Sequence, residues 1–242
     1  MKRILLMVLR NLIRLPGLLI KLWKYSSNVD KYTDEERNKF LKYIVHIANK
    51  GGNVKIESYG VENIPNENGF MLFPNHQGMY DVLALLDACP KPLSVVAKKE
   101  VAKIPLLKQL FKIMNVIFMD REDIRQSLQV IIEVSKQVNQ GKNYIIFPEG
   151  TRSKNGNKVG EFKGGSFKAA TKAKCPIVPV ALIDSFKPFD TKSIEQVTVQ
   201  VHYLEPLLYE DYKEMNTNDI AEEVKKRIIE VIEKNRKKDV DN

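Results

Sequence analysis

Residues 69–89, GFMLFPNHQGMYDVLALLDAC, decide the fold of this chain. The apolar run 69–73 predicts a buried strand, and the apolar periodicity of 80–89 predicts a helix. A polar loop that contains His76 joins the two segments. A buried strand that leads through a short loop into a helix is the repeating unit of α/β sheets.

The same alternation continues on both sides of this unit. Further strands are expected at 54–58, 93–97, 115–119, 143–147, 176–182 and 196–203, and further helices at 34–50, 99–113, 122–139, 166–174 and 218–237. The helix at 34–50 begins with a capping box. The pattern predicts an α/β fold with a mixed, mostly parallel sheet flanked by helices.

The first 25 residues, MKRILLMVLRNLIRLPGLLIKLWKY, carry much of the charge of the chain. The net charge is +9, and the residues before Asp30 include six basic side chains and no acidic one. On a helix the basic side chains fall within an arc of roughly 120°, opposite an apolar face. The basic residues are Lys2, Arg3, Arg10, Arg14, Lys21 and Lys24, and the apolar face comprises Leu5, Leu6, Met7, Leu9, Leu12, Ile13, Leu15, Leu19 and Leu22.

Such a segment is typical of a helix that lies in the interface of an anionic membrane. Its basic residues interrupt the apolar run, so a transmembrane span of about 20 residues is not expected. We expect Pro16-Gly17 to kink the helix. The alternative, an amphipathic helix packed on the protein's own core, stays open. The predicted organisation is a membrane-associating helical segment over 1–52 and an α/β domain over 53–242.

The composition limits which binding partners and which cellular compartment are expected. Because two thirds of the excess charge lies on an apolar segment and not on folded surface, we expect no nucleic-acid partner. Cys89 and Cys175 lack CxxC spacing, and three scattered histidines form no metal motif, so neither zinc nor a disulfide is expected. Free, buried thiols suit a reducing compartment, which predicts peripheral or monotopic attachment to the cytoplasmic face of the cell membrane.

The loop after 69–73 carries the first candidate site. In α/β sheets the chemistry gathers in loops at the carboxyl ends of strands. His76 lies in this loop, and Asp81 falls in the first turn of the next helix, where the two side chains can meet. A carboxylate that fixes the tautomer of an imidazole allows the imidazole to accept a proton. The pair alone is also compatible with a surface histidine and an unrelated aspartate.

A second loop begins after the strand expected at 115–119. It starts with Asp120 and Arg121. The planar guanidinium of Arg121 can grip a phosphate through two parallel hydrogen bonds. A local salt bridge from Arg121 to Asp120 or Glu122 is the alternative.

The third loop follows the strand expected at 143–147 and reads Pro-Glu-Gly-Thr-Arg-Ser over 148–153. Gly150 permits a close backbone approach, and backbone amides together with Thr151 and Arg152 can hold an anion. Glu149 cannot bind phosphate, so we expect it to hold an arginine or to accept a hydrogen bond from a substrate hydroxyl. A base beside two arginine sites implies a substrate with both a hydroxyl and a phosphate, and the amino-terminal segment implies a lipid.

These blocks together resemble the 1-acylglycerol-3-phosphate acyltransferases, within the glycerolipid acyltransferases. The resemblance extends from Gly60 to Val180. The family's NHxxxxD, arginine-ending, FPEGTRS and VPV blocks match Asn75, His76 and Asp81; Ile117–Arg121; Phe147–Ser153; and Val178–Val180.

The resemblance implies roles for the candidate residues. His76 would be the general base, with Asp81 as its orienting acid, and Arg121, Glu149 and Arg152 would lie at the phosphate end of the acyl acceptor. The implied acceptor is lysophosphatidate, and the implied acyl donor is acyl carrier protein or coenzyme A, with no metal or organic cofactor. The expected product is phosphatidate for phospholipid synthesis.

The sequence departs from the family pattern at two places. Asn115 stands where the family usually has glycine, and Leu106-Leu107-Lys108 follows Ile104-Pro105 where aromatic and glycine residues are common. The stretch after Pro105 is expected to border the acyl chain, so the preferred chain length does not follow from the sequence.

Direct transfer through a ternary complex is the expected mechanism, because the histidine motif includes no serine or cysteine nucleophile. Ser166 and Cys175 lack an evident base. Alternatives that stay open are an acyltransferase for glycerol 3-phosphate or another lysophospholipid, and a non-catalytic peripheral lipid-binding protein.

Overall fold

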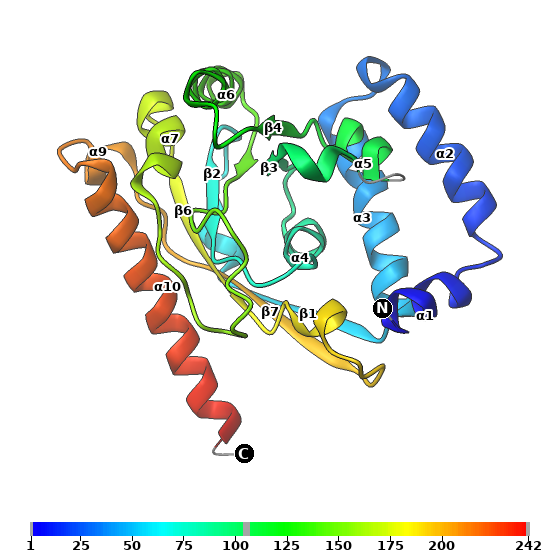
Figure 1. Cartoon of the computed structure of the whole chain (residues 1–242). Helices are drawn as coiled ribbons and strands as arrows, with labels where there is room; N and C mark the ends of the chain where they lie inside the picture. The colour runs from blue at the N-terminus through cyan, green and yellow to red at the C-terminus, as the bar shows by residue number, and fades with distance from the viewer. Residues whose placement is uncertain (1, 104–106, 241–242) are drawn as a thin grey trace.

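The computed structural model describes residues 2–103 and 107–240 of the chain (Figure 1). Seven strands in these residues form one sheet in the order β1-β7-β6-β2-β5-β3-β4. The strands are β1 (Val54–Tyr59), β2 (Met71–Pro74), β3 (Ser94–Lys98), β4 (Ile117–Met119), β5 (Tyr144–Ile145), β6 (Ile177–Ile183) and β7 (Val197–Tyr203). All neighbours pair in parallel except β6 and β7, so the predicted mixed, mostly parallel sheet is confirmed.

The helices connect and cover these strands. The α-helices are α1 (Lys2–Arg10), α2 (Leu15–Ser27), α3 (Asp34–Gly51), α4 (Asp81–Ala88), α5 (Leu107–Ile113), α6 (Ile124–Asn139), α7 (Lys168–Ala173), α8 (Lys187–Asp190), α9 (Tyr209–Tyr212) and α10 (Thr217–Val240). Short 3-10 helices lie at Val29–Lys31, Val61–Asn63, Lys99–Lys103 and Gly164–Phe167. The capping box of α3 is present, with Thr33 and Glu36 bonded to each other's backbone N–H.

The sheet buries both of its faces, because side chains along a strand point alternately to opposite sides. In β2, Leu72 packs into one core together with residues of α3 and α4, while Met71 and Phe73 pack into the other. The second core is closed by α6, α7 and α10, which lie on the opposite side of the sheet from α3 and α4 (Figure 1). Both cysteines are free and buried, as the sequence predicts.

Two predicted helices differ in the structure. The helix expected over 99–113 corresponds to a 3-10 helix at Lys99–Lys103 and to α5 at Leu107–Ile113. Residues 104–106 lie outside the described residues, and they include Leu106, the first residue of the stretch expected to border the acyl chain. The amino-terminal helix breaks at residues 11–14, not at Pro16-Gly17; Pro16 instead lies in the first turn of α2, where its missing N–H leaves no helical hydrogen bond unmade.

The amino-terminal helices pack in part on the protein itself, which is one of the two arrangements considered for them. α1 packs on the protein through Arg3 and Met7, followed by the buried Asn11, and the guanidinium of Arg3 donates to the backbone oxygens of Gly52 and Ser193, at 2.5 and 2.9 Å. The predicted single arc of solvated basic side chains is therefore wrong at Arg3, which is 2% exposed because backbone oxygens replace water around it.

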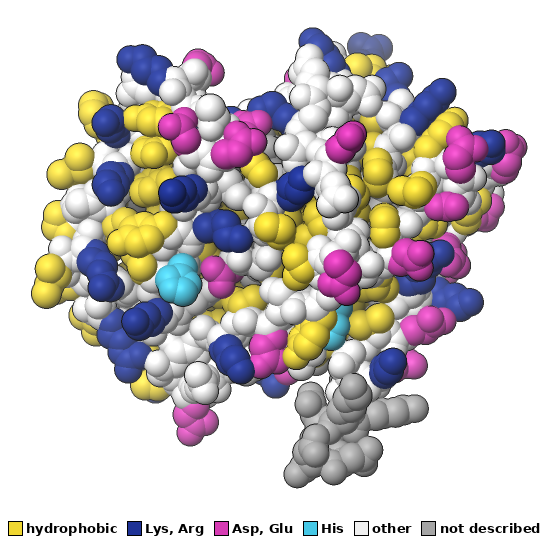
Figure 2. Space-filling view, turned by 180° about the vertical axis from the view of Figure 1, so that it is seen from behind, with side chains coloured by type: hydrophobic (Ala, Val, Ile, Leu, Met, Phe, Trp, Pro, Cys, Tyr) yellow, Lys and Arg dark blue, Asp and Glu magenta, His cyan; other side chains and the backbone are white. Residues whose placement is uncertain are grey.

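Most of the predicted apolar face nevertheless faces solvent. Ile13 is 97% exposed and Trp23 is 67% exposed, and both have apolar neighbours that are also exposed. Along the left edge of Figure 2, where α1 and α2 lie, hydrophobic and basic side chains alternate. In the described parts of the chain, no helix is both long and apolar enough to cross a membrane.

The strand order determines which loops meet. β5, β2 and β6 are adjacent and parallel, so the loops that follow them leave the same edge of the sheet. These loops contain His76 after β2, Glu149 after β5 and Ser185 after β6. This edge of the sheet therefore carries the candidate site.

Candidate active site

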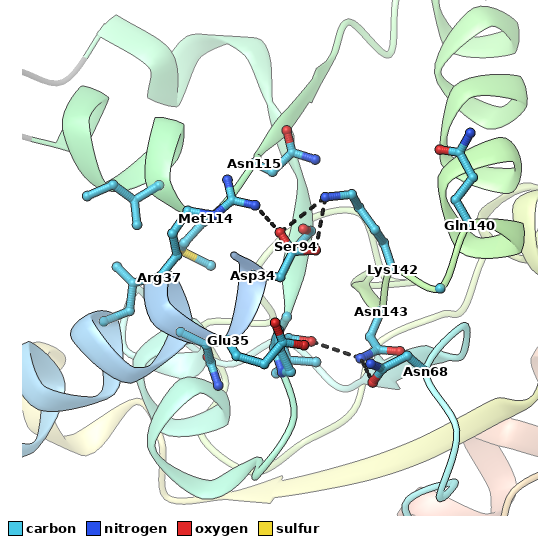
Figure 3. A pocket seen from close by; sticks show the side chains of 16 residues that line it. Asp34, Glu35, Arg37, Asn68, Ser94, Met114, Asn115, Gln140, Lys142 and Asn143 are labelled. Carbon is cyan, nitrogen blue, oxygen red and sulfur yellow. Dashed lines mark hydrogen bonds and ion pairs between the residues drawn. The ribbon is translucent and has the colours of Figure 1, made fainter. Parts of the chain in front are cut away.

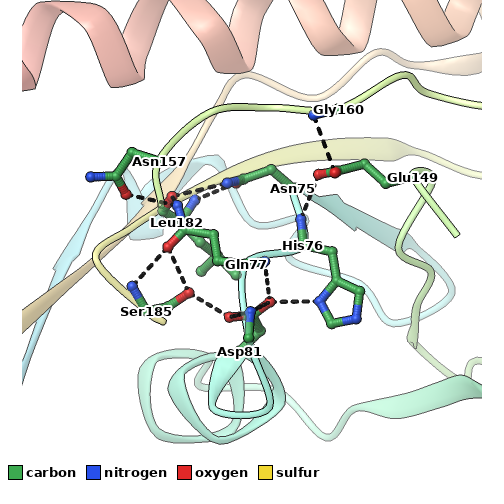
Figure 4. Close-up of polar contacts among 10 residues, drawn as sticks. Asn75, His76, Gln77, Asp81, Glu149, Asn157, Gly160, Leu182 and Ser185 are labelled. Carbon is green, nitrogen blue, oxygen red and sulfur yellow. Dashed lines mark hydrogen bonds and ion pairs between the residues drawn. The ribbon is translucent and has the colours of Figure 1, made fainter. Parts of the chain in front are cut away.

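The loop between β2 and α4 folds back on the first residue of the helix. Asp81 is fully buried, and its Oδ2 accepts hydrogen bonds from the backbone N–H groups of Gln77, at 2.7 Å, and Gly78, at 3.0 Å (Figure 4). A carboxylate in the first turn of a helix is also favoured by the helix dipole. The position of Asp81 thus fixes the loop that carries the histidine.

His76 and Asp81 form a direct pair, as the sequence predicts. Nδ1 of His76 lies 2.6 Å from Oδ2 of Asp81, and the imidazole stacks on the ring of Phe147 with the centroids 4.1 Å apart. Because an ionised carboxylate can only accept, Nδ1 carries the proton, which leaves Nε2 as a free acceptor. The side chain of His76 is 21% exposed, so solvent and a substrate can reach it.

Glu149 holds the same loop from the other side. Its Oε1 accepts from the backbone N–H of His76 at 2.7 Å, and its Oε2 accepts from the backbone N–H of Gly160 at 3.1 Å (Figure 4). Burial raises the pKa of this carboxyl above its ordinary value, while the two N–H donors act in the opposite direction. Within residues 2–103 and 107–240, Glu149 has no ion pair with an arginine, and its observed contacts hold the histidine loop. Its predicted contact with a substrate hydroxyl stays a prediction.

Arg121 and Gly150 lie side by side, although 29 residues of chain separate them. A Cβ atom placed on Gly150 would lie 3.3 Å from Nη1 of Arg121 and 3.4 Å from Nζ of Lys163. Gly150 has a φ of 73°, which a residue without a side chain adopts at little cost. Two cations therefore approach the backbone of the third loop.

Among the described residues, Arg121 does not form the local salt bridge that was the alternative role for it. Asp120 pairs with Lys99 and accepts from the backbone N–H of Glu122 at 3.1 Å. Burial lowers the pKa of Arg121 from its ordinary value, and the nearby carboxylate of Glu100 acts in the opposite direction. The guanidinium stays charged, because even a lowered arginine pKa lies far above neutrality.

A separate cavity lies at the opposite edge of the sheet. It has a volume of about 250 Å³ and is lined by Ser94 and Asn143, at the amino-terminal ends of β3 and β5, and by Asp34. Figure 3 shows Arg37 and Lys142 converging on the carboxylate of Asp34. None of the residues expected at the catalytic site lines this cavity.

Comparison with known proteins identifies the family. The family model described as Acyltransferase matches residues 55–183, which is more than half of the chain. The chain is 31% identical over 181 residues to the 1-acyl-sn-glycerol-3-phosphate acyltransferase of Borreliella burgdorferi, covering 72% of each protein. The chain belongs to the 1-acyl-sn-glycerol-3-phosphate acyltransferase family.

Other proteins named for the same activity are also similar to this chain over most of its length. A probable 1-acyl-sn-glycerol-3-phosphate acyltransferase of Mycoplasma pneumoniae is 28% identical over 224 residues, which is 87% of this chain and 83% of that protein. The crystal structure of the 1-acyl-sn-glycerophosphate (LPA) acyltransferase of Thermotoga maritima is similar with a TM-score of 0.69 and 24% identity, covering 95% of this chain and 96% of the other. The structural likeness confirms the glycerolipid acyltransferase fold.

Two candidates of the FPEGTRS block remain predictions. Thr151 is exposed, and the side chain of Arg152 is partly buried. The next residue, Ser153, donates its backbone N–H to the carbonyl oxygen of His76 at 2.9 Å, which ties this end of the block to the histidine loop. In the described part of the acyltransferase chain, no side-chain hydrogen bond or ion pair engages Arg152.

Sequence reasoning missed several residues of this site. Ser185 and Gln77 surround Asp81, Phe147 supports the imidazole, and Lys163 lies beside Gly150. The loop after the strand expected at 176–182 could have indicated Ser185, because an apolar strand there is followed by the polar residues Asp184 and Ser185.

Proposed function

We propose that this protein transfers an acyl group from an acyl thioester to the 2-hydroxyl of 1-acyl-sn-glycerol 3-phosphate, giving phosphatidate for phospholipid synthesis. The observation that carries the proposal is the His76–Asp81 pair, with 2.6 Å between Nδ1 and Oδ2 and a partly exposed imidazole. The family membership supports the acceptor, because relatives named for this reaction align with most of the chain.

In the proposed mechanism, Nε2 of His76 takes the proton of the acceptor hydroxyl. The oxygen attacks the thioester carbonyl, a C–O bond forms, and the tetrahedral intermediate collapses with cleavage of the C–S bond. The departing thiolate receives the proton from the imidazolium, which restores His76. Asp81 stabilises the imidazolium and keeps Nε2 directed at the hydroxyl. The proposed reaction steps need neither a metal nor an organic cofactor.

A direct transfer is proposed because the earlier candidates for an acyl nucleophile are poorly activated. Burial raises the pKa of the Cys175 thiol to about 12, so little thiolate is present near neutrality. The hydroxyl of Ser166 contacts the carbonyl oxygen of Pro148 at 3.4 Å and has no imidazole partner. A covalent acyl-enzyme would need a nucleophile paired with a base.

The acceptor phosphate is proposed to bind beside Gly150. The cationic side chains of Arg121 and Lys163 lie within reach of that backbone, which supports this placement. Arg152 is proposed to complete the phosphate site together with Thr151, and a glycerol hydroxyl is proposed to contact the loop that Glu149 holds. Charge-assisted hydrogen bonds from a guanidinium are stronger than neutral ones, so they suit a phosphate anchor.

Attachment to the anionic, cytoplasmic face of the membrane is proposed to occur through α1 and α2. The exposed apolar side chains of α2 and of the turn before it, including Ile13, Ile20 and Trp23, support this surface. The basic residues Arg14, Lys21 and Lys24 are exposed in the same turn and helix and would meet anionic headgroups.

The test is an assay of the purified protein with several acceptors and both donor types. Lysophosphatidate, glycerol 3-phosphate and a lysophospholipid with a headgroup are each supplied with acyl-coenzyme A and with acyl carrier protein. We expect turnover with lysophosphatidate to exceed that with the other acceptors by at least about tenfold. Glycerol 3-phosphate lacks the acyl chain and its contacts, and the headgroup of the lysophospholipid interferes with the contacts of the phosphate. Absence of transfer with every pair would contradict the proposed function.

A further inference from the structure

A buried serine lies directly behind the carboxylate that orients His76. Ser185 is fully buried, and its hydroxyl is hydrogen-bonded to Oδ1 of Asp81, the oxygen that does not face the imidazole (Figure 4). The same hydroxyl lies 3.1 Å from Oε1 of Gln77. Oε1 of Gln77 also accepts the backbone N–H of Ser185 at 2.9 Å. Because an ionised carboxylate is a stronger acceptor than an amide oxygen and its contact with the hydroxyl is the shorter one, we assign the single hydroxyl proton to Oδ1 of Asp81.

The backbone around Ser185 is held on both sides. Asp184 has a φ of 62°, and its N–H donates to Oδ1 of Asn157 at 2.8 Å, while Nδ2 of Asn157 donates to Oδ1 of Asp184 at 2.9 Å. Nε2 of Gln77 donates to the same Oδ1 of Asn157 at 2.8 Å. The strained residue before Ser185 is thus connected to the histidine loop through one asparagine, as expected where surrounding contacts maintain an unfavourable backbone conformation.

The loop after β6 also packs tightly against the histidine loop. A Cβ atom on Gly78 would lie 3.1 Å from Cα of Phe186, closer than nearly all real Cβ contacts. Gly78 is also one of the backbone donors to Asp81. Neither loop can therefore shift without moving the carboxylate, which sits between them.

We propose that Ser185 is a positioning residue for acyl transfer. It donates to Oδ1 of Asp81 and thereby fixes the rotation of the carboxylate, so that Oδ2 faces Nδ1 of His76. This inference rests on the proposed function, because it assigns Ser185 a role in the His76 mechanism. Ser185 is fully buried and does not touch the substrate, so it acts on the chemical step through Asp81 and leaves substrate binding unchanged.

The test is a set of serine variants assayed with lysophosphatidate and an acyl thioester. We expect Ser185→Ala to lower kcat by about 10-fold to 100-fold, the usual cost of removing a partner behind a functional histidine, with KM unchanged. Ser185→Thr, which keeps the hydroxyl, is expected to restore at least half of the wild-type kcat. If Ser185→Ala does not fold, Ser185→Cys replaces it, because cysteine has a similar volume and only a weak donor. The same loss of kcat with unchanged KM is then expected for Ser185→Cys.

The matched control is Ser135→Ala. Ser135 is also a buried serine whose hydroxyl is hydrogen-bonded, to the carbonyl oxygens of Ile131 and Ala169, but it lies in α6 away from the candidate site. We expect Ser135→Ala to lower Tm as much as Ser185→Ala does while retaining wild-type kcat. An equal loss of kcat in both variants would overturn the proposal.

A spectroscopic readout separates this inference from the proposed function. The Nδ1 proton of His76, assigned by its loss in His76→Ala, should give a downfield ¹H resonance in the wild type that moves upfield or broadens in Ser185→Ala. A wild type without transfer activity would refute the proposed function but leave this readout intact. An active wild type, with Ser185→Ala unchanged in both kcat and the resonance, would overturn the role of Ser185 alone.

Discussion

Nδ1 of His76 lies 2.6 Å from Oδ2 of Asp81, although the two residues are five positions apart in the chain. On a continuous helix, side chains at this spacing would point about 140° apart. They meet because His76 lies in the loop and Asp81 is the first residue of α4. The backbone N–H groups of Gln77 and Gly78 bind the carboxylate and hold the loop in the shape that brings the imidazole to the carboxylate.

Asp81→Asn tests the orienting role of the carboxylate. An amide in this position can present its NH2 group to Nδ1, which would reverse the tautomer and place the proton on Nε2. We therefore expect kcat to fall by about 10²- to 10⁴-fold, and in a Ser-His-Asp triad the equivalent change costs about 10⁴-fold. Steady-state kinetics with lysophosphatidate measures the effect; a variant with kcat within a factor of about two of wild type would remove Asp81 from the mechanism.

Glu149→Gln tests whether the buried carboxylate orients the histidine loop. The amide resembles the protonated acid and has one acceptor oxygen for the two N–H donors of His76 and Gly160. We expect kcat to fall by about tenfold, because one buried donor loses its partner and the loop shifts.

The pH dependence follows from the same contact. Burial raises the pKa of Glu149, so the ionised form, which accepts both bonds, is lost as the pH falls through a value above that of an ordinary glutamate. The wild type should therefore lose activity on the acid side, while the relative deficit of Glu149→Gln shrinks there. A deficit that stays constant from acid to neutral pH would contradict this role.

Arg121→Ala tests the phosphate site beside Gly150. Removing a charge-assisted hydrogen bond costs about 1.5–3 kcal/mol, so the KM for lysophosphatidate should rise by about 10-fold to 100-fold. Lys163→Ala should give a smaller rise, because a lysine makes no bidentate contact. The control is Arg125→Ala, which removes an exposed arginine of α6. Equal KM values for Arg121→Ala and Arg125→Ala would place the phosphate elsewhere.

The exposed apolar side chains of the amino-terminal helices make the membrane surface testable. The double variant Ile13→Asp and Trp23→Asp removes two exposed apolar groups and adds two negative charges. Since burial of one such side chain contributes about 1.5–3 kcal/mol, sedimentation with anionic vesicles should weaken by at least about tenfold. Leu208→Asp, at an exposed site beside α9, is the control (Figure 1). Unchanged sedimentation of the double variant would exclude this surface.

Much of the fold was predictable because the apolar runs are short and regularly spaced. The strand expected at 69–73 appears at Met71–Pro74, and the helix expected at 34–50 appears at Asp34–Gly51. The break near residue 12 was not predicted, because a proline marks the first turn of a helix as well as a kink. The burial of Arg3 was also missed, since its backbone acceptors, Gly52 and Ser193, lie far away in the sequence.

The site was predictable where a motif is contiguous and unpredictable where it is assembled by pairing of strands. His76 and Asp81 belong to one contiguous motif, in the loop and in the first turn of the following helix, and were identified together. Ser185 enters the site only because β6 lies beside β2 in the sheet. The contacts of Glu149 were not predicted because its partners are backbone N–H groups, which every residue except proline carries and no sequence pattern distinguishes.

The most direct test of the account is the kcat of His76→Ala in the assay with lysophosphatidate and an acyl thioester. Asp81 keeps its bonds from Gln77, Gly78 and Ser185 in this variant, so Tm should remain close to that of the wild type. General-base catalysis contributes about 10²- to 10⁴-fold, and we expect a loss of that size in kcat. A folded His76→Ala protein that transfers the acyl group at nearly the wild-type rate would contradict the account.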